Sequence, residues 1–455
     1  MPELLQKKLF TEPEAGVLLA KILAEAESLF VKKLSRNDRD WAGRLNKHQA
    51  GIYVPPAARD SGFFPPLQTK VRDNPAADEI RETFLPLHWL ETGVFRTARL
   101  AHYTSKGPET HLTRLPKDAF RYLSPASLMV IGKNADGTCN ALTLDSEGTD
   151  SEILSDLLDL PPDFTVGIFR LNALHEAREA RTFTFLDEVM RAYFDGTIAQ
   201  LSSQYGTLPT TEDLANVARM RYLRAHGIHT LNPFLMEAPG DAIRVISRGL
   251  EYEIFKDLQM RQRVIELVRM LLGDDPSAIT PAKALRAIVV EYPKIDALLL
   301  SAAQQRKSRA GYSFEHHIEA LLRDGSVPHE KQVVIAAKKR PDFILPSHVL
   351  YADPTRRHDE ALVLSAKTTL RERWKQVRQE ISDCDLYLAT VDENIAANAI
   401  EDMAAQGIIL VVPESLKNSK TADYEKQGSV ISFKTFFEIE IREKRWNTWR
   451  AKSVV

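Results

Sequence analysis

An aspartate and a lysine that lie 25 positions apart in this chain could together cleave a phosphodiester. Asp342 follows Pro341, and Lys367 begins the run Lys-Thr-Thr-Leu-Arg-Glu-Arg-Trp. A carboxylate can hold Mg²⁺, which prefers oxygen ligands and keeps several of its waters. The metal lowers the pKa of a bound water, and a lysine ammonium can orient that water. These residue types therefore predict hydrolysis of a phosphate ester with Mg²⁺ as cofactor.

Two short apolar segments would have to position these side chains. Residues 340–346 and 361–367 are apolar runs flanked by breakers and charge, a pattern typical of buried strands. Residues 368–383 are expected to form a helix beside the second strand, and this helix could return Glu380 to the metal. We therefore predict that Asp342 and Glu380 are the metal ligands.

The arrangement resembles the PD-(D/E)XK nuclease pattern, with one departure. The position two before Lys367, usually acidic, is Ser365, so Glu380 would supply the missing carboxylate. A proline–aspartate pair followed by a lysine also occurs by chance. In that case Asp342 would be a solvated loop residue, and Lys367 would be an ordinary strand end.

A longer stretch favours the nuclease interpretation. Over roughly residues 208–420, the chain resembles the catalytic domain of EcoRII-type restriction endonucleases. The matching segments are residues 306–311, 313–315, 341–343, 367–374 and 407–413, together with Glu380. The resemblance implies that Asp342, Lys367 and Glu380 form the catalytic core. It also implies that the acid Glu315 lies on the preceding helix.

The N-terminal region carries a second resemblance. Residues 33–38 and 48–55 resemble the effector domain of the same group, a pseudobarrel related to plant transcription-factor DNA-binding domains. The residues that this resemblance places at DNA are Lys33, His48, Tyr53, Glu109, His111 and Arg114. His48 and Tyr53 could instead be packed at a strand edge. Gly107 and His111 stand where the family has basic residues, so this domain need not read the same DNA sequence as its relatives.

The triplet Arg371, Glu372 and Arg373 suits base recognition. Arginine can bond guanine O6 and N7, and a carboxylate can accept from cytosine N4. The resemblance implies that the triplet reads a CC/GG half-site, as in a CCWGG-like sequence. The alternative for these residues is an exposed, charged first turn of a helix.

Arg248 and Tyr252 are four positions apart, which is about one helical turn. A base turned out of the duplex could stack between them, as the family resemblance also implies. A simple packing pair is the alternative.

Length and residue patterns define the expected fold class. A chain of 455 residues is too long for one typical core. We expect a β-rich pseudobarrel domain over residues 1–195, a linker over 196–207, and an α/β catalytic domain with a central mixed sheet over 208–455. The linker is indicated by small and polar residues that end in a turn signal.

Composition restricts partners and compartment. The formal net charge is −2, so any DNA-binding surface must be local. Cys139 and Cys384 show no metal-binding pattern and suit free thiols in a reducing cytoplasm, without zinc. The sequence contains no apolar run of about 18 residues, so we expect no membrane-spanning segment.

Together these features predict a type II restriction endonuclease that acts on double-stranded DNA. A palindromic site implies a homodimer, and a cognate DNA methyltransferase would be the functional partner. The N-terminal domain would bind a second DNA copy as effector or autoinhibitor. Two alternatives stay open: a DNA-binding regulator that does not cut, and a repair-type nicking nuclease on the same fold.

Overall fold

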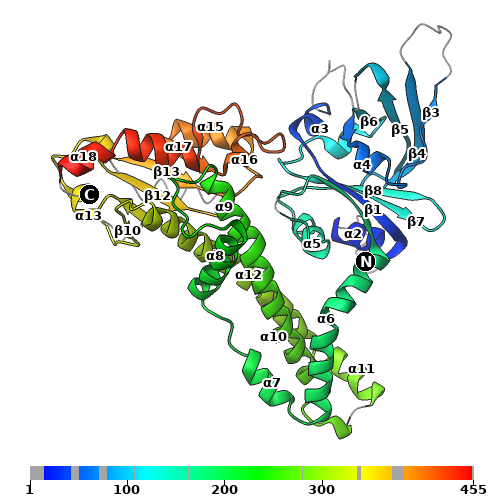
Figure 1. Cartoon of the computed structure of the whole chain (residues 1–455). Coiled ribbons are helices and arrows are strands. Elements are labelled where there is room, and N and C mark those ends of the chain that lie inside the picture. The colour runs from blue at the N-terminus through cyan, green and yellow to red at the C-terminus, as the bar shows by residue number, and fades with distance from the viewer. Residues whose placement is uncertain are drawn as a thin grey trace, which may run out of the picture. The chain divides into compact units, whose positions relative to one another are not determined.

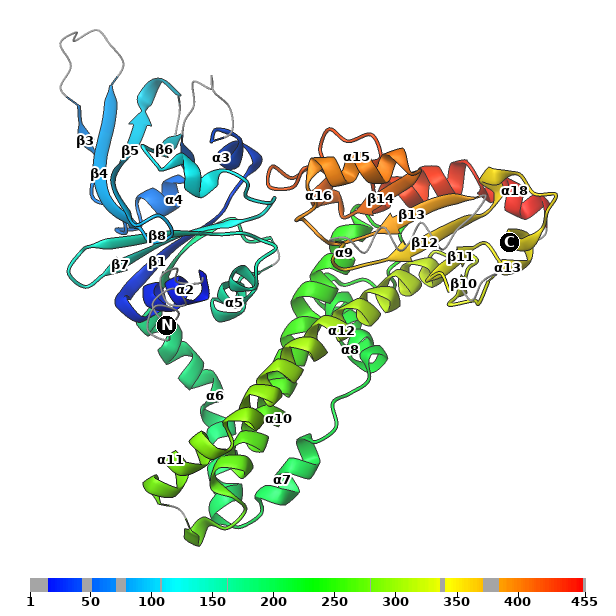
Figure 2. The same cartoon turned by 180° about the vertical axis from the view of Figure 1, so that it is seen from behind.

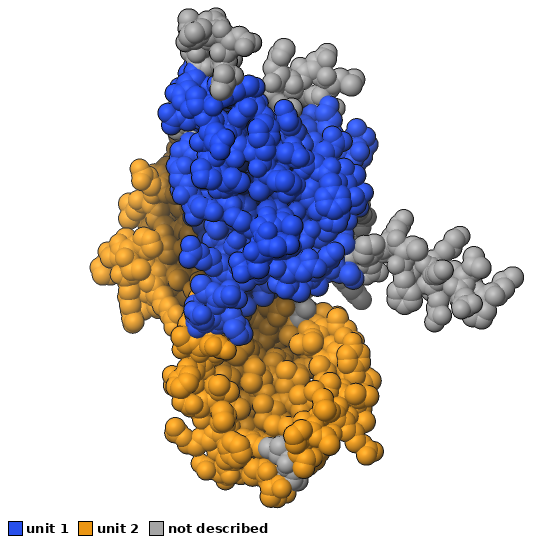
Figure 3. Space-filling view, turned by 90° about the vertical axis from the view of Figure 1, so that its right-hand side faces the viewer, with its two compact units in different colours: residues 1–178, 393–397, 419–425 blue, residues 179–392, 398–418, 426–455 orange. Residues whose placement is uncertain are grey.

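The computed structural model describes residues 15–42, 51–70, 79–106, 109–161, 163–278, 280–335, 340–370 and 384–452. Two compact units are coloured separately in Figure 3. Unit 1 comprises Met1–Arg178, Glu393–Ala397 and Ser419–Glu425. Unit 2 comprises Glu179–Asp392, Asn398–Asn418 and Lys426–Val455.

Within the described ranges, unit 1 is built on a nine-stranded sheet with the order β2-β6-β5-β4-β8-β7-β1-β9, and β3 pairs with β4. All pairings are antiparallel except that of β4 with β8. The strands are β1 (Ala26–Lys33), β2 (Ile52–Val54), β3 (Gln68–Thr69), β4 (Ile80–Trp89), β5 (Val94–Tyr103), β6 (Thr110–Thr113), β7 (Leu128–Asn134), β8 (Cys139–Leu144) and β9 (Val166–Arg170).

Successive side chains of a strand point to opposite faces of the sheet. Buried clusters cover both faces. In β1, Phe30 belongs to one buried cluster, which also contains Trp89. Its neighbour Leu29 belongs to a second cluster, which contains Ile22 of helix α2 (Ala15–Glu25) and Leu154 of α5 (Thr149–Leu157). The predicted β-rich N-terminal fold is therefore confirmed. The shorter helices of the unit are α3 (Arg36–Asp40), α4 (Pro56–Arg59), η1 (Thr104–Lys106) and η2 (Lys117–Phe120).

Unit 2 contains a six-stranded sheet within the part of the chain that the structure describes, and its strands follow one another in sequence order. The first two pairings are antiparallel and the next three are parallel, so the predicted mixed sheet is confirmed. The strands are β10 (Glu330–Lys331), β11 (Phe343–Leu345), β12 (Leu362–Ala366), β13 (Asp385–Ala389), β14 (Ile408–Val412) and β15 (Val430–Ser432).

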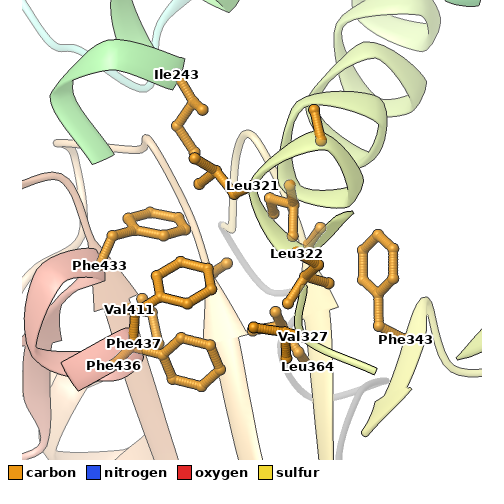
Figure 4. Packing of buried hydrophobic residues seen from close by; sticks show 14 of the residues in the cluster. Ile243, Leu321, Leu322, Val327, Phe343, Leu364, Val411, Phe433, Phe436 and Phe437 are labelled. Carbon is orange, nitrogen blue, oxygen red and sulfur yellow. The ribbon is translucent and has the colours of Figure 1, made fainter. Parts of the chain in front are cut away.

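Helices pack around this sheet (Figures 1 and 2). The long helix α12 (Tyr292–Asp324) lies beside α10 (Tyr252–Leu272), and its C-terminal part packs against β12. Figure 4 shows Leu321 and Leu322 of α12 near Phe343 and Leu364 of the sheet in one buried cluster.

The other elements are α6 (Leu171–Phe194), α7 (Ile198–Tyr205), α8 (Thr211–His226), α9 (Pro239–Val245), the π-helix η3 (Ile246–Glu251), η4 (Pro276–Ala278), α11 (Pro281–Val290), α13 (His348–Ala352), η6 (His358–Glu360), α15 (Ala397–Ala405), α16 (Glu414–Lys417), α17 (Phe433–Thr435), the π-helix η7 (Phe436–Glu443) and α18 (Trp446–Ala451).

The segment predicted as a linker, residues 196–207, contains helix α7. Ile198 and Leu201 are buried in a cluster with Ile265 of α10, so one face of α7 is packed against α10. The domain limits 1–195 and 208–455 stay a prediction. None of the helices in the described ranges combines the length and the apolar composition that crossing a membrane requires.

Candidate active site

Asp342 and Lys367 meet where β11 and β12 pair. Phe343 pairs with Leu364, so Asp342, which precedes β11, lies opposite the end of β12. Asp342 Oδ2 accepts hydrogen bonds from Lys367 Nζ and from the backbone nitrogen of Ala366, both at 2.8 Å. The Asp342 side chain is 10% exposed and that of Lys367 is 31% exposed. The pair is therefore mostly shielded but still accessible from solvent.

The surrounding strands hold this pair in place. Every residue of β11 and β12 is buried, with Phe343 and Leu364 in the main core of unit 2. Beyond β12, the backbone nitrogen of Lys367 donates to the carbonyl of Ala389 on β13 at 3.0 Å. The lysine backbone is thus still tied to the sheet, and only its side chain is left to move.

Glu315 of α12 adds a second carboxyl group. It is 9% exposed, and burial together with the nearby Asp342 carboxylate raises its pKa, while Lys367 and Gln332 partly oppose that rise. Gln332 links the two acids, because its side chain donates to Glu315 Oε2 at 2.9 Å and its backbone nitrogen donates to the Asp342 carbonyl at 3.0 Å. Gln332 was not predicted from the sequence, because it lies outside the nuclease motif and its neighbours in sequence do not distinguish it from other polar residues.

The donor set fits a hard divalent cation. Asp342 Oδ1 makes no hydrogen bond to a described residue, and the buried hydroxyl of Ser365 on β12 likewise has no partner there. Oxygen ligands of this kind are what Mg²⁺ prefers. The described ranges contain no cluster of three or more His, Cys, Asp or Glu side chains that could hold a metal ion. A third carboxylate would have to come from elsewhere.

Several predicted residues lie outside the described residues. They are the metal ligand Glu380, the base-reading triplet Arg371, Glu372 and Arg373, and His48 of the N-terminal region. Their roles stay predictions.

The proposed base pocket begins in a π-helix. Arg248 lies in η3, and its Nη1 donates to the carbonyl of Val391 at 3.2 Å. Tyr252 is the first residue of α10. Because a π-helix closes i→i+5 hydrogen bonds, a spacing of four is not one full turn here. A π-helix is frequently found at functional sites, but a role for this pair in base binding stays a prediction.

A buried polar network flanks Glu315 on α12, with Ser313 two residues before it and His317 two residues after it, and no sequence motif marks this network. His317 is fully buried, with Nε2 2.8 Å from Glu251 Oε2, and Ser313 also donates to Glu251. Burial lowers the pKa of His317, which the Glu251 carboxylate partly opposes. The network joins α12 to η3.

The described effector residues of unit 1 do not share one environment. Tyr53 and His111 pair across β2 and β6, with ring centroids 6.0 Å apart, and both are half-buried. Glu109 and Arg114 are exposed. Lys33 is instead buried, with Nζ 2.8 Å from Glu393 Oε1, a residue of the same unit. The structure therefore brings Tyr53 and His111 together and gives Lys33 a carboxylate partner.

Known proteins resemble this chain, and one of them resembles it over most of its length. Residues 284–437, which include Asp342 and Lys367, match the family model described as EcoRII C terminal. The chain is 25% identical over 407 residues to the type II restriction enzyme EcoRII of Escherichia coli, which covers 88% of this chain and 90% of that protein. It is 31% identical over 182 residues to the type II restriction enzyme SsoII of Shigella sonnei, which covers 37% of this chain and 58% of that protein.

Solved structures of two nucleases also align with the chain. Metal-depleted Ecl18kI in complex with uncleaved DNA is 26% identical, with a TM-score of 0.46, over 55% of this chain and 86% of that one. The complex of restriction endonuclease PspGI with substrate DNA is 19% identical, with a TM-score of 0.38, over 51% of this chain and 92% of that one. The matched C-terminal family model and the similarity to EcoRII along most of the chain support an EcoRII-type enzyme, a site-specific endonuclease.

Proposed function

We propose that this enzyme makes Mg²⁺-dependent double-strand cuts in DNA at a short site with CC/GG flanks. The observation that carries the proposal is the 2.8 Å contact between Lys367 Nζ and Asp342 Oδ2 at the end of β12, with the buried Glu315 beside it. A carboxylate, an ammonium and a second acid at one strand end form a suitable set for phosphodiester hydrolysis.

Each residue of the site has a separate task in this proposal. Asp342 and Glu380 would hold the cation, which when bound would supply an activated water and offset charge on the phosphate. Lys367 keeps its ammonium beside the Asp342 carboxylate, where it can orient the attacking water. Glu315, whose pKa is raised, can exist as the neutral acid at a higher pH than an exposed glutamate and can hold a proton near the phosphate.

Specificity is assigned to residues that follow the catalytic lysine. Arg371, Glu372 and Arg373 read adjacent G·C pairs from the major groove, as the chemistry of guanine and cytosine edges allows. Arg248 and Tyr252 hold a base turned out of the duplex. In the described structure, Arg248 already donates to Val391, so this contact would have to coexist with base binding or break.

A two-fold dimer would match a palindromic site, because each subunit then supplies one active site. Helix α11 supports this proposal, since it buries none of its described residues although most of them are apolar. Leu285 is 66% exposed and Val289 is 76% exposed. Val289→Glu should shift the sedimenting species towards the monomer, while the equally exposed Val349→Glu on α13 serves as the matched control. A dimer that is unchanged by Val289→Glu would remove α11 from the interface.

The role assigned to unit 1 is to bind a second DNA copy, as an effector or autoinhibitory domain. The support is that the similarity to EcoRII extends over 88% of this chain and so includes unit 1. The functional partner would be a cognate DNA methyltransferase that protects sites from cleavage, and the compartment would be the cytoplasm, where DNA is met.

The deciding experiment is cleavage of a randomised plasmid library by the purified full chain, with the ends sequenced. Cuts should require Mg²⁺, disappear with a chelator, and fall on both strands at one short motif. Nicks on one strand would indicate the nicking nuclease. Sequence-specific binding without any cleavage would indicate the non-cutting regulator.

A further inference from the structure

A buried acid lies at the end of β13, and neither the proposed catalysis nor the proposed base reading uses it. Asp392 follows β13 by three residues and is 5% exposed. Its Oδ2 accepts a hydrogen bond from the backbone nitrogen of Leu370 at 2.8 Å. Leu370 is fully buried and lies three residues after Lys367. A side chain from the neighbouring strand thus holds the chain after it leaves β12.

Backbone contacts fix the position of Asp392 itself. Its nitrogen donates to Thr390 Oγ1 at 3.0 Å, and the nitrogen of Thr390 donates to the carbonyl of Val411 on β14 at 2.9 Å. One residue before Asp392, the carbonyl of Val391 accepts from Arg248 at 3.2 Å. The acid is therefore connected to β14 on one side and to η3 on the other, all within unit 2.

Residues 367–370 consequently have two attachments to the end of β13. The first is the ladder hydrogen bond from Lys367 to Ala389, and the second is the bond from Leu370 to Asp392. Asp392 takes over the role of a strand acceptor after regular pairing has ended. A carboxylate suits this role, because hydrogen bonds to an ionised acceptor are stronger than those to a neutral one.

We propose that Asp392 is a positioning residue for base recognition. By fixing Leu370, it sets the point in space from which the next three residues of the chain, Arg371, Glu372 and Arg373, begin. It holds Lys367 less directly, because that residue has its own ladder bond to Ala389. Loss of Asp392 should therefore harm discrimination between DNA sequences more than the rate of bond cleavage. This inference rests on the proposed function of the triplet.

The test compares full-length variants in the plasmid-library assay and measures the ratio of cleavage at the preferred site to cleavage at its single-base variants. Asp392→Ala leaves a buried N–H without its acceptor and should lower that ratio about tenfold. Asp392→Asn keeps an oxygen acceptor and should restore most of the ratio. The matched control is Asp324→Ala, since Asp324 Oδ2 accepts from the buried nitrogen of Leu231, also at 2.8 Å. The control should lower thermal stability without changing the ratio.

If Asp392→Ala does not fold, Thr390→Val replaces it, because this variant removes only the hydroxyl that accepts from Asp392. It should lower the ratio in the same direction by a smaller factor. An unchanged ratio in the folded variant, with cleavage reduced equally at all sites, would overturn the inference and leave Asp392 a purely structural residue. A wild-type chain that cuts no DNA in Mg²⁺ would overturn the proposed function itself, and this inference with it.

Discussion

The end of β12 in unit 2 and the β2–β6 edge in unit 1 both bring functional candidates together across adjacent strands, but in different surroundings. In unit 2, Asp342 and Lys367 carry opposite charges, with side chains 10% and 31% exposed. In unit 1, Tyr53 and His111 lie ring to ring, and neither has a carboxylate in the contact that joins them.

The difference separates a site that can perform chemistry from one that can bind. Charges that are partly removed from water interact strongly, so the unit 2 site can hold a cation and orient a water. Half-buried rings at a strand edge can contact a DNA surface without changing it. Within unit 1, Lys33 and Arg114 also differ in their surroundings. Lys33 is buried against the Glu393 carboxylate, whereas Arg114 is exposed.

The largest effect is expected when the unit 2 carboxylate loses its charge. Asp342→Asn keeps an oxygen that can accept from Ala366 but weakens the cation site, so cleavage should fall by about a thousandfold or more, while specific DNA binding is kept. Cleavage and binding assays on one DNA fragment measure both. Asp402→Asn, an exposed aspartate on α15, is the control. Near wild-type cleavage by Asp342→Asn would exclude Asp342 as a ligand.

A smaller effect is expected from the triplet that follows β12. Arg371→Ala or Arg373→Ala should cost about 1–3 kcal/mol per guanine contact and relax preference at that base pair. Competition binding against single-base variants of the site measures this. If the arginines contact only phosphates, binding to all sequences should weaken alike. The slope of the logarithm of the binding constant against the logarithm of salt concentration should then fall in magnitude by about one. That result would show that these two arginines do not read the base sequence.

A comparable change is expected when unit 1 is removed. A fragment from Glu179 loses the first turns of α6 but keeps the rest of that helix and all of α7, including the buried side chains that pack with α10. If unit 1 is autoinhibitory, this fragment should cut single-site DNA about 5–150-fold faster than the full chain, the range of typical coupling energies. Site-bearing oligonucleotide added in trans should stimulate the full chain, and Tyr53→Ala with His111→Ala should reduce that stimulation. Slower cleavage by the fragment and no stimulation in trans would instead indicate that unit 1 only tethers DNA.

The smallest effect concerns stability near the active site. Because burial and Asp342 raise the pKa of Glu315, the folded state favours its neutral form. The stability from this group is complete below its unfolded pKa, about 4.3, and is lost as pH rises through the raised folded pKa. Glu315→Gln should therefore gain thermal stability over wild type as pH increases, in the absence of metal. Melting curves across that pH range measure the difference, and a constant difference would show that Glu315 is not destabilised by ionisation.

Local patterns predicted the parts of the fold that depend on neighbours in sequence. The runs 340–346 and 361–367, which were predicted as buried strands, contain β11 and β12. Strand and helix signals are readable because burial on a sheet or on one helix face imposes a short period of apolar residues. The resemblance to EcoRII-type nucleases, carried by the same segments, is confirmed by the C-terminal family match.

Tertiary structure decided what these local signals could not carry. Sequence marked Asp342 and Lys367 as partners, but only strand pairing brings Lys367 Nζ to Asp342 and places Gln332 and Glu315 beside them. Lys33 carries a charge that predicts exposure, yet folding buries it against Glu393, far away in the chain. Asp392 acquires its role solely because β12 and β13 are parallel neighbours. In each case the reason is the same: burial and pairing depend on contacts between distant segments, and these contacts do not exist until the sheet has formed.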